Sequence, residues 1–259
     1  MSSTLTSDAV ASVLRRLHAN ADAEDHVAKQ RVHDREAEIG RRLSAPERYE
    51  LYGDAPLAIS REVGELYYVL AMSRGARLTV EFGASHGIST VYLAAGIRDG
   101  GRGSLITTEL LPQKAEAARQ NLAEAQLDDF VEVRVGDATK TLENLMGPVD
   151  VLVLGGRNDQ YVRILQLVEP QLAPDALVLA DLGKDDPDLR RYQGHVRDAD
   201  HGYFSIELPL DAGLEVSVRI PNGSALDQAP RSVESEAAEK APTPKGAEDI
   251  YGETWIDRS

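Results

Sequence analysis

The most constraining feature of this chain is a glycine-spaced turn at residues 83–87, which joins an apolar segment to a helix-compatible one. Val80 and Phe82 belong to the apolar segment, which predicts a buried strand. Gly83 and Gly87 allow the backbone to turn sharply and to approach a ligand closely. Residues 88–95 are then expected to form a helix, so the segment predicts a nucleotide-type binding turn.

An acidic residue in this strand narrows the choice of ligand. Glu81 lies next to the turn, where a carboxylate would repel the pyrophosphate of a dinucleotide. The same carboxylate would attract a cationic amino-acid group. The sequence therefore favours a nucleoside that carries a positive charge.

Composition limits the kind of protein this is. The chain has 259 residues and 42% hydrophobic residues, enough for one large α/β domain with extensions. Lys and Arg number 28 and Asp and Glu number 43, giving a net charge of −15, which disfavours binding to nucleic acid or to anionic membranes. The absence of cysteine excludes disulfides, thiolate nucleophiles and Cys-ligated metals.

The sequence also bears on location. The first residues lack a basic region followed by an apolar core, and no apolar stretch approaches the roughly 20 residues that span a bilayer. With a sequence pI of about 4.8, the chain is predicted to be a cytoplasmic protein without a membrane segment.

Strand-like and helix-like segments alternate through the middle of the chain. This alternation predicts a mostly parallel, doubly wound α/β sheet with helices on both faces. The last two strands, separated by residues 209–213, predict an antiparallel hairpin at the sheet edge. The expected strands are 78–82, 104–108, 131–135, 149–154, 176–180, 203–208 and 214–220, and the expected helices are 87–97, 112–125, 139–145, 159–172 and 185–198.

The two ends of the chain differ from this middle region. Residues 8–43 predict one or two surface helices, residues 45–56 a proline-containing connector, and Ser60 the N-cap of a helix over 61–71. We expect residues 1–55 to form a helical extension, 56–220 the ligand-binding domain, and 221–259 a disordered acidic tail. The N-terminal helices offer a surface for a homodimer.

In a doubly wound sheet the ligand lies beyond the carboxyl ends of the strands. Glu109 follows the second strand, and its carboxylate is able to accept hydrogen bonds from both hydroxyls of a ribose. Asp137 follows the third strand and is a candidate partner for the amine of adenine, with Ala138 as a small wall. One adenosine ligand would explain all of these positions.

Three segments, at 81–90, 107–121 and 135–138, together resemble the class I S-adenosylmethionine-dependent methyltransferases, in the branch of the catechol and caffeoyl-coenzyme A O-methyltransferases. Segments 59–64 and 208–215 also match that branch. The resemblance covers about residues 55–220 and implies a Rossmann-like seven-stranded sheet. It further implies methyl transfer to a small-molecule acceptor and S-adenosylmethionine bound by Glu81, Gly83, Ser85, Gly87, Ser89, Glu109, Asp137 and Ala138.

The chain departs from this branch at the metal ligands. In the metal-dependent members, an aspartate ends the fourth strand, a lysine follows three residues later, and Asp-Asn ends the fifth strand. Here these positions are Gly155, Asn158, Asp181 and Leu182. A single carboxylate rarely holds Mg²⁺, which requires several oxygen ligands. We therefore expect no metal at this site.

Without a metal, a general base must remove the proton of the acceptor. The main candidates are His86, Asp159 and Asp181, and the sequence does not choose between them. A histidine has a suitable unperturbed pKa of about 6.5. Further candidates with weaker positional support are Asn158, His195 and His201.

Hydroxyl methylation of a small molecule is the leading prediction, and amine methylation is less favoured. A noncatalytic regulator or assembly partner that binds S-adenosylmethionine is the alternative, because the metal positions are changed and the C-terminal tail carries aromatic residues. An NAD-dependent oxidoreductase is a third candidate. It is disfavoured by Glu81 and by the lack of a Tyr-x-x-x-Lys pair.

Overall fold

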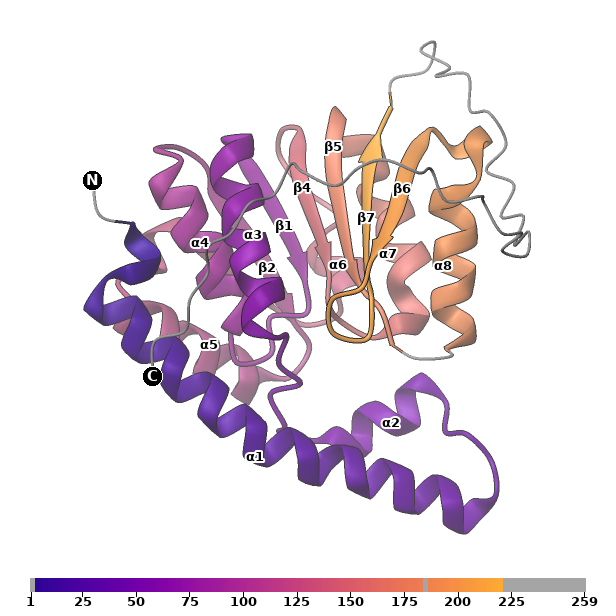
Figure 1. Ribbon diagram of the computed structural model, residues 1–259. Coiled ribbons are helices and arrows are strands. Elements are labelled where there is room, and N and C mark those ends of the chain that lie inside the picture. The colour runs from indigo at the N-terminus through magenta and orange to yellow at the C-terminus, as the bar shows by residue number, and fades with distance from the viewer. Residues whose placement is uncertain (1–2, 184–185, 221–259) are drawn as a thin grey trace, which may run out of the picture. The chain divides into compact units, whose positions relative to one another are not determined.

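A computed structural model describes residues 3–183 and 186–220 of the chain. These residues form a seven-stranded sheet in the order β3-β2-β1-β4-β5-β7-β6 (Figure 1). β7 runs antiparallel to both β5 and β6, whereas the other pairs are parallel. The predicted α/β fold with a C-terminal antiparallel pair is therefore confirmed. The strands are β1 Leu78–Phe82, β2 Ser104–Glu109, β3 Val131–Val135, β4 Val149–Leu154, β5 Leu172–Asp181, β6 Tyr203–Leu208 and β7 Leu214–Arg219.

The strand order reverses beside β1. The chain passes outward from β1 through β2 to β3 and then returns to β4 on the other side of β1. Phe82, at the end of β1, is paired with Thr108 of β2 and with Leu154 of β4. The carboxyl ends of these strands thus meet at one edge of the sheet, where the reversal opens a crevice suited to a ligand.

Helices cover both faces of the sheet, as its near-continuous apolar strands require. Leu152 and Val178 lie in a core shared with α6, α7 and α8. The neighbouring residues Val153 and Leu179 point to the other face and lie in a core shared with α3 and α4. The helices are α1 Asp8–Ile39, α2 Ala45–Tyr52, α3 Arg61–Arg74, α4 Ile88–Asp99, α5 Pro112–Glu124, α6 Ala138–Thr141, α7 Tyr161–Val168 and α8 Pro187–Arg197.

The N-terminal region corrects one prediction. Residues 45–52, expected to be a connector, form helix α2. Ser44 and Glu47 make a reciprocal capping box, and a proline in the first turn is compatible with a helix because that turn leaves its backbone N–H groups unpaired. The residues between α2 and α3, 53–60, are non-helical and are called the strap below. α1 is one continuous helix, and α1 and α2 lie at the carboxyl ends of the parallel strands (Figure 1).

Several element boundaries also differ from the predictions. β5 begins at Leu172, four residues before the expected start, while α6 ends at Thr141, four residues before the expected end. α7 is shorter than the predicted helix 159–172 because 3-10 turns flank it on both sides. The predicted tail at 221–259 lies outside the described residues. No helix within 3–183 and 186–220 combines the length and apolarity needed to cross a membrane.

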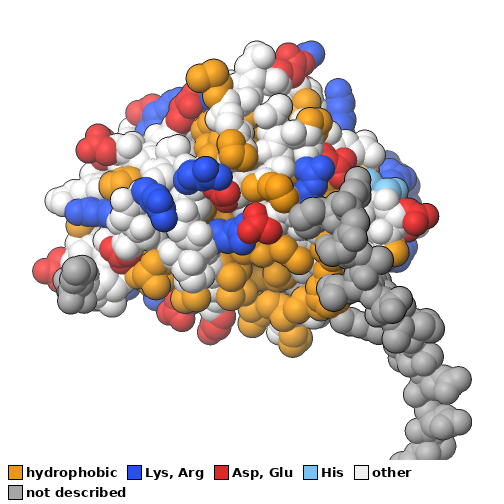
Figure 2. Space-filling model, turned by 90° about the horizontal axis from the view of Figure 1, so that it is seen from above, with side chains coloured by type: hydrophobic (Ala, Val, Ile, Leu, Met, Phe, Trp, Pro, Cys, Tyr) orange, Lys and Arg blue, Asp and Glu red, His pale blue; other side chains and the backbone are white. Residues whose placement is uncertain are grey.

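On the α3 side of the sheet, the strands β5, β7 and β6 carry apolar side chains that are only partly buried. Leu177, Leu208 and Val216 are of this kind, and Ile206 is exposed. Seen from the amino ends of the parallel strands, hydrophobic side chains gather along one edge, and charges of both signs are interspersed elsewhere (Figure 2). The expected homodimer stays a prediction.

Candidate active site

A cavity of about 1100 Å³ lies at the carboxyl ends of the parallel strands. Its wall combines the glycine turn, the ends of β2 to β5, the β6–β7 turn, the strap and the facing residues of α1 and α2. A cavity at the point where strand order reverses is the expected place for a ligand in this fold. Of the predicted cofactor residues, all except Gly87 line it, and of the main candidate bases, His86 and Asp181 line it but Asp159 does not.

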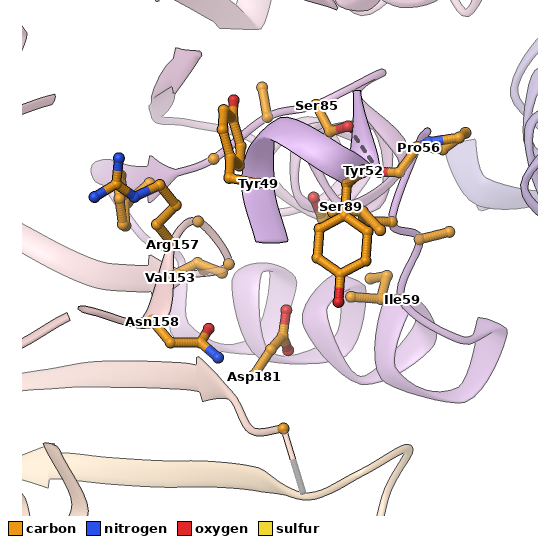
Figure 3. Close-up of a pocket in the computed structure, with 18 of the residues that line it drawn as sticks. Tyr49, Tyr52, Pro56, Ile59, Ser85, Ser89, Val153, Arg157, Asn158 and Asp181 are labelled. Carbon is orange, nitrogen blue, oxygen red and sulfur yellow. Dashed lines mark hydrogen bonds between the residues drawn. The ribbon is translucent and has the colours of Figure 1, made fainter. Parts of the chain in front are cut away.

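The glycine turn has the predicted strand–turn–helix form. Gly83 and Gly87 have φ angles of 99° and 87°, which favour glycine. A Cβ atom at Gly83 would come within 2.7 Å of the backbone of Gly156, so the close approach of the two loops requires glycine there. Ser85 also has a positive φ of 47°, and its hydroxyl donates to the Pro56 carbonyl at 2.7 Å, which ties the turn to the strap (Figure 3).

Glu81 is almost completely buried beneath this turn. Its Oε2 accepts hydrogen bonds from the hydroxyls of Thr90 and Thr107, each at 2.6 Å. Its Oε1 is buried without a partner among the described residues. Burial raises the pKa of Glu81. A buried acceptor without a donor costs free energy, and a ligand that brings a cationic N–H group would satisfy it.

Glu109 at the end of β2 faces the other part of the cavity. Its Oε2 accepts from the backbone N–H of Ser85 at 2.8 Å, and its Oε1 accepts from the N–H of Leu111 at 2.9 Å. The hydroxyl of Tyr49, on α2, also donates to Oε1 at 3.2 Å. Sequence reasoning missed Tyr49, because it lies 60 residues away in a segment expected to be a connector.

Asp137 and Ala138 lie at the end of β3, on the cavity wall. Asp137 caps α6 by accepting from the N–H of Thr139 at 2.9 Å. These hydrogen bonds to Thr139 lower the pKa of Asp137. Asp137 thus remains ionised, with its Oδ1 engaged by the N–H of Thr139.

The strap closes the cavity from the side of α1 and α2. Asp25 of α1 is buried and accepts hydrogen bonds from the N–H groups of Leu57 and Ala58 at 2.7 and 2.8 Å. Leu57 has a positive φ of 51°, a conformation that costs a leucine free energy and persists only when its surroundings enforce it. Lys114 donates to the Ala55 carbonyl at 2.8 Å and fixes the start of the strap.

Asp181 ends β5 and is the carboxylate on the far side of the cavity. The hydroxyl of Tyr67, on α3, donates to its Oδ1 at 2.7 Å, and Tyr161 donates to its backbone carbonyl at 3.1 Å. The Asp181 carboxyl points into the cavity beside Asn158 (Figure 3). Burial raises the pKa of Asp181 to about 7, although the Tyr67 hydrogen bond acts in the opposite direction.

Comparison with known proteins agrees with this arrangement. Residues 80–181 match the family model of a methyltransferase domain. The chain is 35% identical over 126 residues to a catechol O-methyltransferase of Mycobacterium tuberculosis, which covers 48% of this chain and 56% of that protein. It is 31% identical over 155 residues to a protein-L-isoaspartate O-methyltransferase of Methanopyrus kandleri, covering 56% of this chain and 67% of the relative. The chain belongs to the class I S-adenosylmethionine-dependent methyltransferases.

Solved structures support the same family. Cofactor-bound Rv0187 from MTB has a TM-score of 0.57 and 29% identity, covering 64% of this chain and 83% of that one. The O-methyltransferase TomG of Streptomyces achromogenes, in complex with SAM, has a TM-score of 0.55 and 26% identity, and the match covers 63% of this chain and 82% of TomG. The chain is similar to two catechol O-methyltransferases, at 35% and 29% identity. It spans little more than half the length of the catechol O-methyltransferases that it matches, 56% and 59%.

At the positions where metal-dependent catechol and caffeoyl-coenzyme A O-methyltransferases have their metal ligands, this chain has different residues except at Asp181. Gly155 has no side chain, Leu182 is apolar, and the Asn158 amide donates to Asp186 at 3.3 Å. Asp181 is left as the single carboxylate, with Oδ1 engaged by Tyr67. Within residues 3–183 and 186–220, no group of three or more His, Asp or Glu side chains is arranged to hold a metal ion. This donor set does not fit a divalent cation, which prefers several oxygen ligands.

The remaining candidate bases differ in their surroundings. Asp159 is paired with Arg157 at 2.7 Å. Burial raises the pKa of Asp159, but the hydrogen bonds from Arg157 and Gln160 outweigh it and the net pKa is lowered. His86 lines the cavity, and burial, with help from the charge of Lys114, lowers its pKa.

Two further histidines lie elsewhere. His195 and His201 stack with ring centroids 4.1 Å apart, and neither lines the cavity. Among the sequence-predicted bases, the structure therefore brings His86 and Asp181 to the cavity and leaves the others outside it or, like Asn158, without a basic group.

Proposed function

We propose that this chain transfers a methyl group from S-adenosylmethionine to a hydroxyl of a small molecule, and that it does so without a divalent cation. The observation that carries the cofactor assignment is Glu81, which lines the cavity and whose buried Oε1 has no hydrogen-bond partner among the described residues. A fixed acceptor without a donor is expected where a ligand brings the donor. The similarity to catechol O-methyltransferases supports the choice of ligand and reaction.

In this proposal, the acidic residues at the ends of β1 and β2 bind different parts of the cofactor. Glu81 would accept a hydrogen bond from the cofactor's ammonium group, and Glu109 would accept from its ribose hydroxyls. The glycine turn allows the backbone at 83–87 to approach the ligand between these two acids. When bound, the cofactor would supply a methyl group attached to a positively charged sulfur, and this sulfur would be the leaving group when the acceptor oxygen takes the methyl group.

Asp181 is the proposed general base. Its Oδ1 is held by Tyr67, so Oδ2 is the oxygen left to take the proton of an acceptor hydroxyl. A pKa of about 7 keeps a substantial fraction of this carboxyl ionised at neutral pH and makes the ionised form a stronger base than an ordinary aspartate. Asn158, beside it in the cavity, offers an amide that would orient the acceptor oxygen (Figure 3).

Two measurements test these proposals separately. Calorimetry with S-adenosylmethionine and S-adenosylhomocysteine should detect both ligands, and failure to bind either one would overturn the cofactor assignment. Methyl transfer to a panel of phenolic and aliphatic hydroxyl compounds should proceed in EDTA at the same rate as in Mg²⁺. Activity that is lost in EDTA and restored by Mg²⁺ would contradict the metal-independent mechanism.

The noncatalytic alternative makes a different prediction. A regulator that only binds the cofactor would bind S-adenosylhomocysteine but give no methylated product from any acceptor in the panel. The carboxyl of Asp181, turned into the cavity and held by Tyr67, favours an enzyme over this alternative.

A further inference from the structure

The cofactor carboxylate Glu109 already has nearly its full set of hydrogen bonds. A carboxylate has about four acceptor positions, two on each oxygen. Here both positions of Oε1 are filled, by the N–H of Leu111 and the hydroxyl of Tyr49, and the N–H of Ser85 fills one of Oε2. Glu109 is accordingly only 5% exposed. One acceptor position is therefore left for a ribose that brings two hydroxyls.

Of these three donors to Glu109, the Tyr49 hydroxyl is the one that a ligand can displace. The N–H groups of Leu111 and Ser85 belong to the backbone on either side of the site, and their positions are fixed by the β2–α5 connection and the glycine turn. Tyr49 instead lies on α2, the short helix of the N-terminal extension. Its ring is covered by the Lys114 ammonium group, 5.9 Å from the ring centroid.

The same helix reaches the acceptor side of the cavity. Arg48 forms an ion pair with Asp186 at 2.6 Å, next to the end of β5, and Tyr52 lines the cavity. The hydroxyl groups of Tyr49 and Tyr52 point in opposite directions, that of Tyr52 toward Asp181 (Figure 3). Because Arg48, Tyr49 and Tyr52 lie on the same eight-residue helix, a shift of α2 that withdraws Tyr49 would also move the residues that line the acceptor side.

We propose that Tyr49 competes with the cofactor ribose for Glu109, and that α2 thereby links cofactor binding to the shape of the acceptor site. This inference rests on the proposed function, because it takes S-adenosylmethionine as the ligand. The ribose must displace the Tyr49 hydroxyl to make both of its hydrogen bonds to Glu109. Cofactor then binds first, and the acceptor enters a site whose α2 wall has been released.

The test is the affinity of S-adenosylhomocysteine for Tyr49→Phe, measured by calorimetry in the absence of any acceptor. Removing the hydroxyl removes the competitor but leaves the ring under Lys114. The dissociation constant should fall about threefold to tenfold, the effect of one hydrogen bond that no longer has to be broken. Tyr203→Phe is the matched control, because its hydroxyl donates to Glu169 and the residue does not line the cavity, and its cofactor affinity should equal that of the wild type.

Thermal melting gives an independent measure. Ligand-free Tyr49→Phe should melt slightly below the wild type, because it lacks the hydrogen bond to Glu109. Saturating S-adenosylhomocysteine should raise the melting temperature of Tyr49→Phe by more than it raises that of the wild type. Equal or weaker binding by Tyr49→Phe, with binding by the wild type intact, would overturn the competition and leave the proposed function standing. Loss of binding in both proteins would instead refute the proposed function, and this inference with it.

Discussion

The two sides of the cavity are built in different ways. At the ends of β1 and β2, Glu81 and Glu109 are held chiefly by groups from the glycine turn, the helix after it and the adjacent strand. At the end of β5, Asp181 is held by Tyr67 of α3, a residue 114 positions away in sequence. The cofactor side is thus local in sequence, and the acceptor side is assembled from distant segments.

This difference fits the roles proposed for the two sides. The cofactor presents the same ammonium and ribose groups in every member of the family, so one short strand–turn–helix unit with its neighbouring strand is sufficient to bind it. The acceptor side must match one particular small molecule. It is therefore lined by the strap, by α2 and by the loops after β4 and β5.

The largest expected effect is on the acceptor side. Asp181→Asn keeps the size of the side chain and a hydrogen bond with Tyr67 but removes the base, so kcat should fall about 100-fold to 10,000-fold. The affinity for S-adenosylhomocysteine should stay within about twofold of the wild type, because Glu81 and Glu109 are untouched. Steady-state kinetics and calorimetry together measure both quantities.

Asp159→Asn is the matched control for that variant. Asp159 follows β4, near the same side of the protein, but it is paired with Arg157 and does not line the cavity. Its kcat should change less than about threefold. A larger loss of kcat in Asp159→Asn than in Asp181→Asn would show that Asp181 is not the general base.

The next effect concerns the cofactor side alone. Glu81→Gln retains the shape of the side chain and removes its charge, which should weaken S-adenosylhomocysteine binding about 10-fold to 100-fold. The ligand-free variant should not melt below the wild type, because burial raises the pKa of Glu81 and so disfavours its charged form. A variant that melts lower yet binds normally would make Glu81 a structural residue.

The difference between the two sides of the cavity also explains which parts of the site could be predicted from the sequence. The glycine turn and the acids beside it could be read from residues 78–90 and 104–109, because the strand ends and the turn place them without help from distant segments. The seven strands followed from their alternation with helices. Tyr67 and Tyr49 could not be assigned, since in the sequence they are indistinguishable from tyrosines that fill a core.

The helix α2 shows why the remaining errors arose. Pro46 suggested a connector, but a proline in the first turn removes no helical hydrogen bond, and the capping box of Ser44 and Glu47 carries the opposite signal. The ionic partner of Asp159 was equally hidden. Arg157 stands two residues away, but only the fold of the loop determines whether the two side chains meet.

The pH dependence should be moderate in size and confined to the acceptor side. Because the pKa of Asp181 is about 7, kcat should rise with pH and level off above that value. Tyr67→Phe removes a hydrogen bond that lowers this pKa, so the rise should move to higher pH. A pH–rate profile of both proteins measures the shift, and identical profiles would show that Tyr67 does not act on the base.

The same titration also affects folding. The folded-state pKa of Asp181 is raised above its ordinary value of 3.8, so the stability that the protonated carboxyl contributes is fully present below pH 3.8 and is lost as pH rises through about 7. Asp181→Asn lacks this titration. Its melting temperature relative to the wild type should therefore increase between pH 4 and pH 8.

The smallest effect is expected where the two sides meet, at the strap. Asp25→Asn removes the charge that holds the N–H groups of Leu57 and Ala58 and leaves an amide with a single acceptor oxygen. Leu57, with its positive φ, should then relax toward an ordinary backbone conformation and move the cavity wall. We expect KM for the acceptor to rise about twofold to fivefold, with the dissociation constant of S-adenosylhomocysteine changing less. If cofactor affinity suffered more than acceptor KM, the strap would belong to the cofactor side, and the division of the cavity into a local and an assembled side would have to be redrawn with its boundary beyond Ser60.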